Sequence, residues 1–329
     1  MLEHYDHEVE RKVVAILKVL SESTRPLGSI AIARELKEQG IHLSDRAVRY
    51  HLRITDERGY TQPKGRGRVI TAEGQEEAKS ALAADQVGFA IVRLESLAFY
   101  TNFDPGKRKG QVAINTSLFA AEQFERSLGY MKEAFRAGLC ISHLVAVGHQ
   151  GERLGSTVVP KGKIGLATIS SITTSGILLK AGVPADARFG GLLEIRNNKP
   201  RRFVSIITYT GSSLSPSEAY IKGRMTRVGE AARTGSGRVL ANFWEIPRPS
   251  WTMAARTLAR SKEAGLVGAV LGATDEPLCQ IPVTLNRAGL ILLGGLNPVA
   301  MAEEAGIETE NIAGSGIMDS RQLMSIWDL

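Results

Sequence analysis

The chain has very few residues of the kinds that build disulfide frameworks, structural zinc sites or membrane spans. Its 329 residues include two cysteines, Cys140 and Cys279, which lie far apart and form no CxxC pair. This argues against a disulfide framework and a structural zinc site. The longest apolar run, Ala288–Leu296, is about half of a membrane-spanning helix. The acidic, polar N-terminus does not resemble a signal peptide, so we expect a cytoplasmic protein without membrane segments.

The sequence also lacks the motifs of common enzyme classes. It contains no GxSxG, HExxH, P-loop or GxGxxG motif. Its six histidines are scattered, and His143 and His149 do not have the paired spacing of metal ligands. We therefore predict no catalytic residues, no metal and no cofactor.

What the sequence does contain is a local concentration of positive charge. Hydrophobic residues make up 43% and charged residues 23%, which is typical of globular proteins. The net charge of +7 is mild for this length, but residues 44–70 contain seven Arg or Lys and only three acidic residues. A focused basic segment is the electrostatic signature of nucleic-acid binding.

The first eighty residues have the pattern of a winged helix-turn-helix. Apolar residues recur at helical spacing in two segments, which end near Pro26 and Gly40. Ser44 is a good N-cap for a third helix, and Val48 and Leu52 form its inward side. Two short strand-like runs then flank a Pro/Gly turn, which predicts a hairpin wing.

The outward face of the third helix and the wing are both basic. Arginine can bridge two acceptors on a guanine edge or bind phosphate, and a helix fits the major groove of DNA. The helix residues of this face fall at i, i+3, i+4 and i+7. We predict that the residues contacting DNA are Ser44, Arg46, Arg49, Tyr50, Arg53, Lys64, Arg66 and Arg68.

The rest of the chain contains an internal repeat. Gly110–Asn115 resembles Gly237–Asn242 at an offset of 127 residues, and later matches have offsets of 124 and 120. The element order in the first copy, βαββαβ, predicts a two-layer, ferredoxin-like α+β arrangement. In the second copy we expect a helix over Ala288–Ala305 that is broken at Pro298.

These observations predict an α+β protein with four parts. They are a winged-helix domain (1–80), a linker helix (81–104), a first sensor lobe with a connector (105–234) and a second sensor lobe (235–329). The apolar stripe of residues 72–98 fits packing on its own domain and a dimer contact equally well. A crevice between lobes or subunits is the expected ligand site. For an anionic effector, the candidate residues are Arg188, Arg202, Ser212, Ser213 and Arg224.

Several segments resemble one known family. Asp85–Ala90, Arg93–Leu97 and Thr101–Asp104 are similar to the junction of NrpR-type regulators, and so are Gly110–Leu118 and Gly237–Pro247. The resemblance extends over essentially the whole chain.

The resemblance implies a repressor of nitrogen-assimilation genes. Such a protein binds an inverted-repeat operator in double-stranded DNA as a homodimer, through its winged helices. The implied effector is 2-oxoglutarate, which weakens DNA binding under nitrogen limitation. No family motif identifies the residues that contact the effector.

Other functions fit parts of the pattern. An effector-controlled enzyme with an accessory nucleic-acid module would also have two lobes and a crevice. The winged helix could bind RNA or another protein, and an amino acid could replace the keto acid as effector.

Overall fold

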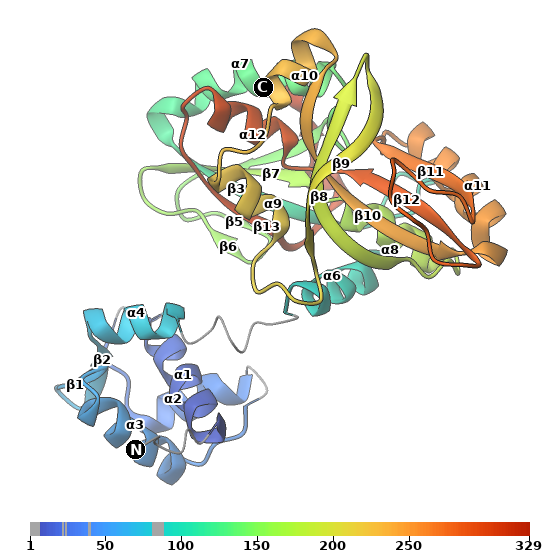
Figure 1. Ribbon diagram of the computed structural model, residues 1–329. Coiled ribbons are helices and arrows are strands. Elements are labelled where there is room, and N and C mark those ends of the chain that lie inside the picture. Colours follow the sequence, from blue (N-terminus) through green and yellow to red (C-terminus); the bar gives the residue numbers. More distant parts are fainter. Residues whose placement is uncertain (1–6, 22, 24, 39–40, 81–88) are drawn as a thin grey trace. The chain divides into compact units, whose positions relative to one another are not determined.

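Two compact units make up the computed structural model, and they divide between Val87 and Gly88 (Figure 1). The structure describes residues 7–21, 23, 25–38, 41–80 and 89–329. The predicted linker helix, 81–104, lies partly outside these residues, and its described part contains α6 (Phe89–Tyr100). Within the described ranges, no helix has both the length and the apolar character needed to cross a membrane.

The N-terminal unit has the element order of a winged helix. Its elements are α1 (His7–Ser21), α2 (Ser29–Glu38), α3 (Asp45–Glu57), β1 (Thr61–Lys64), β2 (Gly67–Ile70) and α4 (Ala72–Ser80). Aliphatic side chains of the first three helices, including Ile16, Ile32 and Val48, form one buried cluster. The predicted order of three helices followed by a hairpin is confirmed.

The hairpin is joined to the helices at its base. Leu27 and Arg68 exchange two backbone hydrogen bonds, with N···O distances of 3.1 and 2.9 Å. This pairing brings the Leu27 backbone so close to Gly67 that a Cβ there would lie 2.8 Å from the Leu27 carbonyl carbon. Glycine is therefore required where the second wing strand begins.

The C-terminal unit contains α6 followed by two copies of one element order. The first copy consists of β3 (Gln111–Ala120), α7 (Phe124–Arg136), β4 (Leu144–Gly148), the short pair β5 (Arg153–Leu154) and β6 (Thr157–Val158), β7 (Lys163–Ile169), α8 (Ile172–Lys180), β8 (Asp186–Arg196) and β9 (Lys199–Thr208). The connector contains α9 (Pro216–Lys222) and α10 (Val228–Thr234). The second copy consists of β10 (Gly237–Pro247), α11 (Trp251–Glu263), β11 (Ala269–Thr274), β12 (Arg287–Leu293), α12 (Asn297–Glu304), β13 (Thr309–Asp319) and β14 (Met324–Ser325). The predicted duplication of a βαββαβ unit is confirmed.

The two copies exchange strands. One five-stranded sheet has the order β13-β3-β7-β4-β14, and the other has the order β11-β12-β10-β8-β9. The second copy's β13 thus pairs antiparallel with β3, and the first copy's β8 pairs antiparallel with β10. The two sheets therefore do not coincide with the expected lobes, 105–234 and 235–329. A sequence repeat reveals element order, whereas strand pairing depends on contacts between residues far apart in the chain.

Equivalent polar side chains connect each copy's second helix to its first strand. The Ala113 amide donates to Thr173 Oγ1, which in turn donates to the Ala113 carbonyl, each at 2.9 Å. Asn297 bonds in the same way to both backbone groups of Leu240, at 2.7 and 3.0 Å. Thr173 and Asn297 are fully buried. Ala113 and Leu240 are separated by 127 residues, the offset of the sequence repeat.

The expected broken helix over Ala288–Ala305 is wrong, because this segment is a strand followed by a helix. Its apolar first half forms β12, between β11 and β10. A strand buried on both faces has a continuous apolar run, which sequence periodicity alone does not distinguish from a buried helix. Pro298 lies in the first turn of α12, where its missing amide proton is not needed.

The linker helix α6 packs on the C-terminal unit through one of its faces. Leu94 and Ala98 are buried there, whereas Val92 and Phe99 on the other face are 57% and 63% exposed. It lies close to α8, because a Cβ on Gly176 would lie 2.7 Å from the Ala98 carbonyl oxygen. The apolar stripe thus packs against its own unit and also leaves an apolar face exposed.

We expect Gly176→Ala to lower the free energy of unfolding of the C-terminal unit by about 1–3 kcal/mol, because overpacking forces α6 and α8 apart. Gly129 in α7 is the matched control, since a Cβ there meets no atom within 4 Å. Gly129→Ala should raise stability by up to about 1 kcal/mol through helix propensity. Urea unfolding of both variants checks this, and equal effects would contradict the α6–α8 contact.

Candidate functional site

The exposed side of α3 carries the predicted DNA-contacting stripe. Val48 and Leu52 are buried on the opposite side of the helix. The exposed side chains of α3 include Arg46, Arg49, Tyr50 and Arg53. Tyr50 is 56% exposed, a large fraction for an aromatic residue. The helical spacing thus yields one accessible face, and its contact with DNA stays a prediction.

Ser44 and Asp45 organise the start of this face. Ser44 Oγ accepts a hydrogen bond from the Ala47 amide at 3.2 Å, so the predicted N-cap is confirmed. Asp45 Oδ2 lies 2.6 Å from Arg49 Nη2, whose side chain is 65% exposed. Ion pairs at such exposed positions contribute little to stability. Arg49 can therefore exchange this carboxylate for a phosphate at small cost.

The predicted cationic side chains of the wing differ in their exposure. Lys64 and Arg66 are exposed beside the turn at Gly65, which has a φ of 61°. Arg68 is half-buried, and its Nε donates to Asp56 Oδ2 at 2.8 Å. The structure therefore places Lys64 and Arg66 at the hairpin tip and gives Arg68 an anchoring role at its base.

A small polar network holds the wing against α3. Thr61 Oγ1 donates to Asp56 Oδ1 at 2.6 Å and lies 2.7 Å from the buried Thr55 Oγ1. These bonds fix how the hairpin is oriented relative to the exposed face of α3. Sequence reasoning missed Thr55, Asp56 and Thr61 as positioning residues, because nothing in their spacing distinguishes them from ordinary helix and strand residues.

A buried histidine lies on the inner side of the same helix. His51 is 5% exposed, and its Nδ1 has no hydrogen-bond partner among the described residues. Burial lowers the pKa of His51 below its usual value, and the positive charge of Lys12 lowers it further. The imidazole is therefore neutral in the folded domain at neutral pH.

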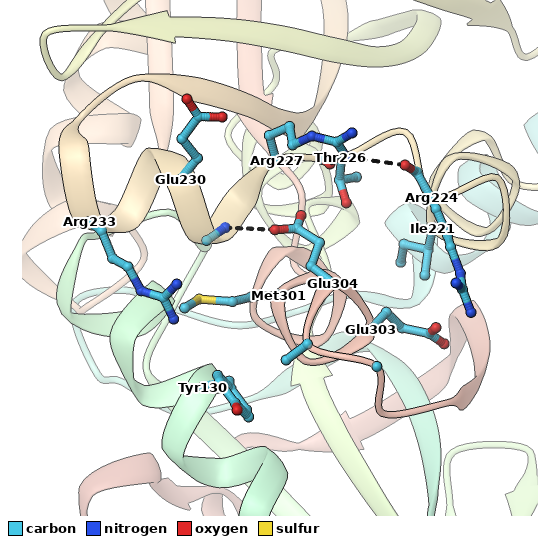
Figure 2. Close-up of a pocket in the computed structure, with 13 residues that line it drawn as sticks. Tyr130, Ile221, Arg224, Thr226, Arg227, Glu230, Arg233, Met301, Glu303 and Glu304 are labelled. Atoms are coloured by element: carbon cyan, nitrogen blue, oxygen red, sulfur yellow. Dashed lines mark hydrogen bonds between the residues drawn. The ribbon is translucent and has the colours of Figure 1, made fainter.

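A second candidate site is an open groove of about 630 Å³ in the C-terminal unit (Figure 2). Its lining residues come from α7, from the segment containing α9 and α10, and from α12. Three arginines, Arg224, Arg227 and Arg233, contribute to it. Figure 2 shows Arg224 and Arg233 on opposite sides of the groove, with Glu304 between them.

Several charges of the groove are already occupied within the protein. Glu304 accepts hydrogen bonds from the Val228 and Gly229 amides at 2.7 and 2.9 Å, at the start of α10. Arg233 Nε bonds to Glu133 at 2.7 Å. These bonds stabilise the walls of the groove and reduce its positive potential.

The other two arginines are neighbours, because Arg227 Nη1 donates to the Arg224 carbonyl at 3.3 Å. Arg227 Nη1 donates to the Thr226 carbonyl at 2.6 Å, so its orientation is fixed. Arg224 has a left-handed backbone with a φ of 51° and an exposed side chain. An anionic ligand in this groove would therefore meet Arg224 and Arg227 first.

The structure does not bring the five predicted effector residues together. Arg188 lies at the start of β8, 3.5 Å from Asp186, whereas Arg202 on β9 bonds to Glu194 at 3.0 Å. Ser212 donates to the Leu214 carbonyl within its own loop at 2.5 Å, and Ser213 is half-buried. Of the five, only Arg224 lines the groove that contains Arg224, Arg227 and Arg233, which we call the arginine groove. The sequence missed Arg233 and Glu304, because contacts across 75 residues have no local signature.

The cysteines and metal-binding side chains form no cluster in the described structure. Cys140 is buried, and burial raises the pKa of its thiol to about 12. The described residues contain no group of three or more His, Cys, Asp or Glu side chains placed to hold a metal ion.

The two units match two families of known proteins. Residues 87–325 match the family described as NrpR regulatory domains NRD1 and 2. The chain belongs to the NrpR family. Residues 14–78 match the ribonuclease R winged-helix domain, in agreement with the fold of the N-terminal unit.

Named relatives of this NrpR chain are regulators. The global nitrogen regulator NrpRI of Methanosarcina mazei is 39% identical over 323 residues, which are 98% of this chain and 99% of that protein. The global nitrogen regulator NrpR of Methanococcus maripaludis is 29% identical over 93% of this chain and 54% of that protein. This chain thus spans about half the length of the second relative. The assignment to regulators and not to enzymes is confirmed.

A solved structure is similar in fold to most of this NrpR chain. The nitrogen repressor-like protein of Methanococcus jannaschii superposes with a TM-score of 0.61 at 25% identity. The match covers 72% of this chain and 98% of that one.

We expect the N-terminal unit to lose stability as the pH falls below about 6.5, because the unfolded His51 takes up a proton that the folded one resists. Thermal unfolding between about pH 7.5 and about pH 5 checks this against the variant His51→Gln, which should flatten the dependence. His42→Gln, at an exposed position of the same unit, is the control. An unchanged pH slope in His51→Gln would show that the histidine does not drive the effect.

Proposed function

We propose that this chain is a cytoplasmic transcriptional repressor that binds the operators of nitrogen-assimilation genes as a homodimer and is released by 2-oxoglutarate. The observation that carries the proposal is the exposed basic face of α3 in a chain that belongs to the NrpR family. Membership in the family supports the class of genes and the kind of effector.

The winged-helix unit supports binding to double-stranded DNA. The exposed face of α3 can enter the major groove, where guanidinium groups recognise guanine edges and the N-terminal residues of the helix lie nearest the bases. Lys64 and Arg66 at the wing tip can contact backbone phosphates at the same time, because the network around Asp56 holds the wing beside α3. Phosphate contacts provide affinity and the helix provides sequence preference.

Homodimerisation accounts for recognition of an inverted repeat. Two identical winged helices related by a two-fold axis bind two half-sites of opposite orientation, separated by about one helical turn, roughly 34 Å. The effector then acts only to the extent that it binds the non-repressing arrangement more tightly, typically by about 1–3 kcal/mol.

The arginine groove offers a place for a dicarboxylate. Arg224 and Arg227 both line it and are neighbours, and arginine binds carboxylates with two parallel hydrogen bonds. The other four predicted residues do not line this groove and could bind an effector only at a separate site: Arg188, Arg202, Ser212 and Ser213. We therefore place the effector contact at Arg224 and Arg227.

We expect Arg49→Ala and Arg53→Ala to weaken operator binding by about 1–3 kcal/mol for each base that the missing guanidinium would have recognised, without unfolding the domain. Arg126→Ala removes the same charge from an exposed position of α7 in the other unit and should bind as the wild type does. Fluorescence anisotropy with labelled duplex DNA checks this. Wild-type affinity in both α3 variants would mean that another surface contacts DNA.

The same measurement with duplex RNA of matched sequence tests the alternative suggested by the winged-helix match. Preference for the DNA operator, with affinity falling steeply as salt increases, is the expected result.

We expect 2-oxoglutarate, and not glutamate, to lower operator affinity of the wild type. Arg224→Ala should raise the keto-acid concentration needed for release while leaving operator affinity in its absence unchanged. Arg202→Ala, whose guanidinium pairs with Glu194, is the matched control. Release by glutamate alone would replace the keto acid with an amino acid as effector, and an unchanged Arg224→Ala response would move the site away from the groove.

A further inference from the structure

An apolar groove of about 390 Å³ lies between α11 and the edge strand β11. Its lining is almost entirely apolar and includes Trp251 and Leu258 of α11 and Leu271 of β11. Figure 1 shows β11 at the margin of its sheet, beside α11. The strand has no charged residue and no proline, which are common protections of an exposed sheet edge.

The outward hydrogen-bonding groups of β11 follow from its pairing with β12. The Gly268 carbonyl accepts from the Leu293 amide at 2.8 Å. Because inward and outward groups alternate along an antiparallel strand, the N–H and C=O groups of Ala269 and Leu271 point away from β12. The Gly272 carbonyl is bonded by the Trp251 indole at 2.8 Å. Within the described chain, no strand pairs with this outer side.

The corresponding place in the other copy shows what such an edge accepts. Val145 of β4 pairs with Thr168, and Ala269 of β11 pairs with Leu292, so both pairs differ by 124 residues. On β4, the outer side is occupied by β14, with Met324 opposite Val145.

The segment after β14 also fills the neighbouring groove in the first copy. Ile326 is fully buried and belongs to the same cluster as Met131 and Phe135 of α7. Arg136 stacks over the Trp327 ring at 5.4 Å. The first copy's edge and groove are thus covered by an added strand and an aliphatic anchor, whereas those of the second copy are open among the described residues.

We propose that a second copy of this chain docks on the α11–β11 face, with the two β11 strands paired antiparallel about a two-fold axis. This inference rests on the proposed function, because a dimeric operator-binding protein needs a two-fold interface. Antiparallel pairing of one strand with itself is self-complementary and closes after two subunits. The apolar groove beside each strand buries side chains of the other copy, as the first copy's groove buries Ile326.

Charges at the two ends of the strand complement this arrangement. The exposed Lys262 lines the groove near the start of β11, and the exposed Glu276 follows two residues after the strand ends. Antiparallel pairing brings the start of one strand to the end of the other, so Lys262 of each copy approaches the partner's Glu276. Unlike charges at the rim of an interface favour the correct pairing.

Sedimentation equilibrium of the full chain tests the interface. Leu271→Asp should raise the monomer–dimer dissociation constant at least about tenfold, because a buried interface anchor becomes a charge. Phe99→Asp, on the exposed apolar face of α6, is the matched control and should dimerise as the wild type does. A dimer that survives Leu271→Asp but not Phe99→Asp would overturn the proposal and assign the interface to α6.

A charge exchange removes the ambiguity of a variant that fails to fold. Lys262→Glu should raise the dissociation constant by about three- to tenfold, and the double variant Lys262→Glu/Glu276→Lys should restore it. Both positions are exposed, so neither change disturbs a core. Failure of the second substitution to restore dimerisation would contradict the antiparallel arrangement.

The outcome is distinguishable from failure of the proposed function. A wild type that dimerises and binds the operator, but is insensitive to both groove variants, overturns only the interface. A wild type that stays monomeric and binds no operator overturns the proposed function as well.

Discussion

The C-terminal unit depends on one constraint: the last strand of each βαββαβ unit, β8 or β13, pairs in the sheet of the other copy. Because β13 completes the sheet of the first copy and β8 that of the second, neither copy has a full sheet of its own. The buried side chains of Thr173 and Asn297 each join the second helix of one copy to the first strand of the same copy, which stabilises each sheet. Each sheet is therefore built from strands of both copies, so the two halves of the unit are joined through backbone hydrogen bonds as well as side-chain packing.

The N-terminal unit separates residues that build the fold from residues available to a ligand. Arg68 and Asp56 are used to orient the wing, whereas Arg46, Arg53, Lys64 and Arg66 are exposed. The ion pair of Arg49 with Asp45 occupies an intermediate position, because it is close but exposed. This division leaves a positively charged surface whose geometry is set by the fold, and pre-organisation of this kind reduces the ordering cost of binding a ligand.

Local features of the sequence predicted local features of the structure. The Ser44 cap, the outward face of α3 and the wing depend on helical periodicity and turn chemistry, and all three are found. The duplication could be predicted from the sequence because its strongest matches, around Ala113 and Leu240, lie in the strands to which Thr173 and Asn297 are hydrogen-bonded. Strand exchange, the strand character of β12 and the capping of α10 by Glu304 were not readable, because each depends on partners far away in the sequence.

We propose that the two winged helices of a dimer recognise the two halves of an inverted repeat. A DNase footprint of the full chain on duplex DNA upstream of nitrogen-assimilation genes measures this recognition. We expect two protected half-sites about one helical turn apart, roughly 34 Å between their centres. Protection of a single site, or uniform weak binding along any duplex, would contradict it.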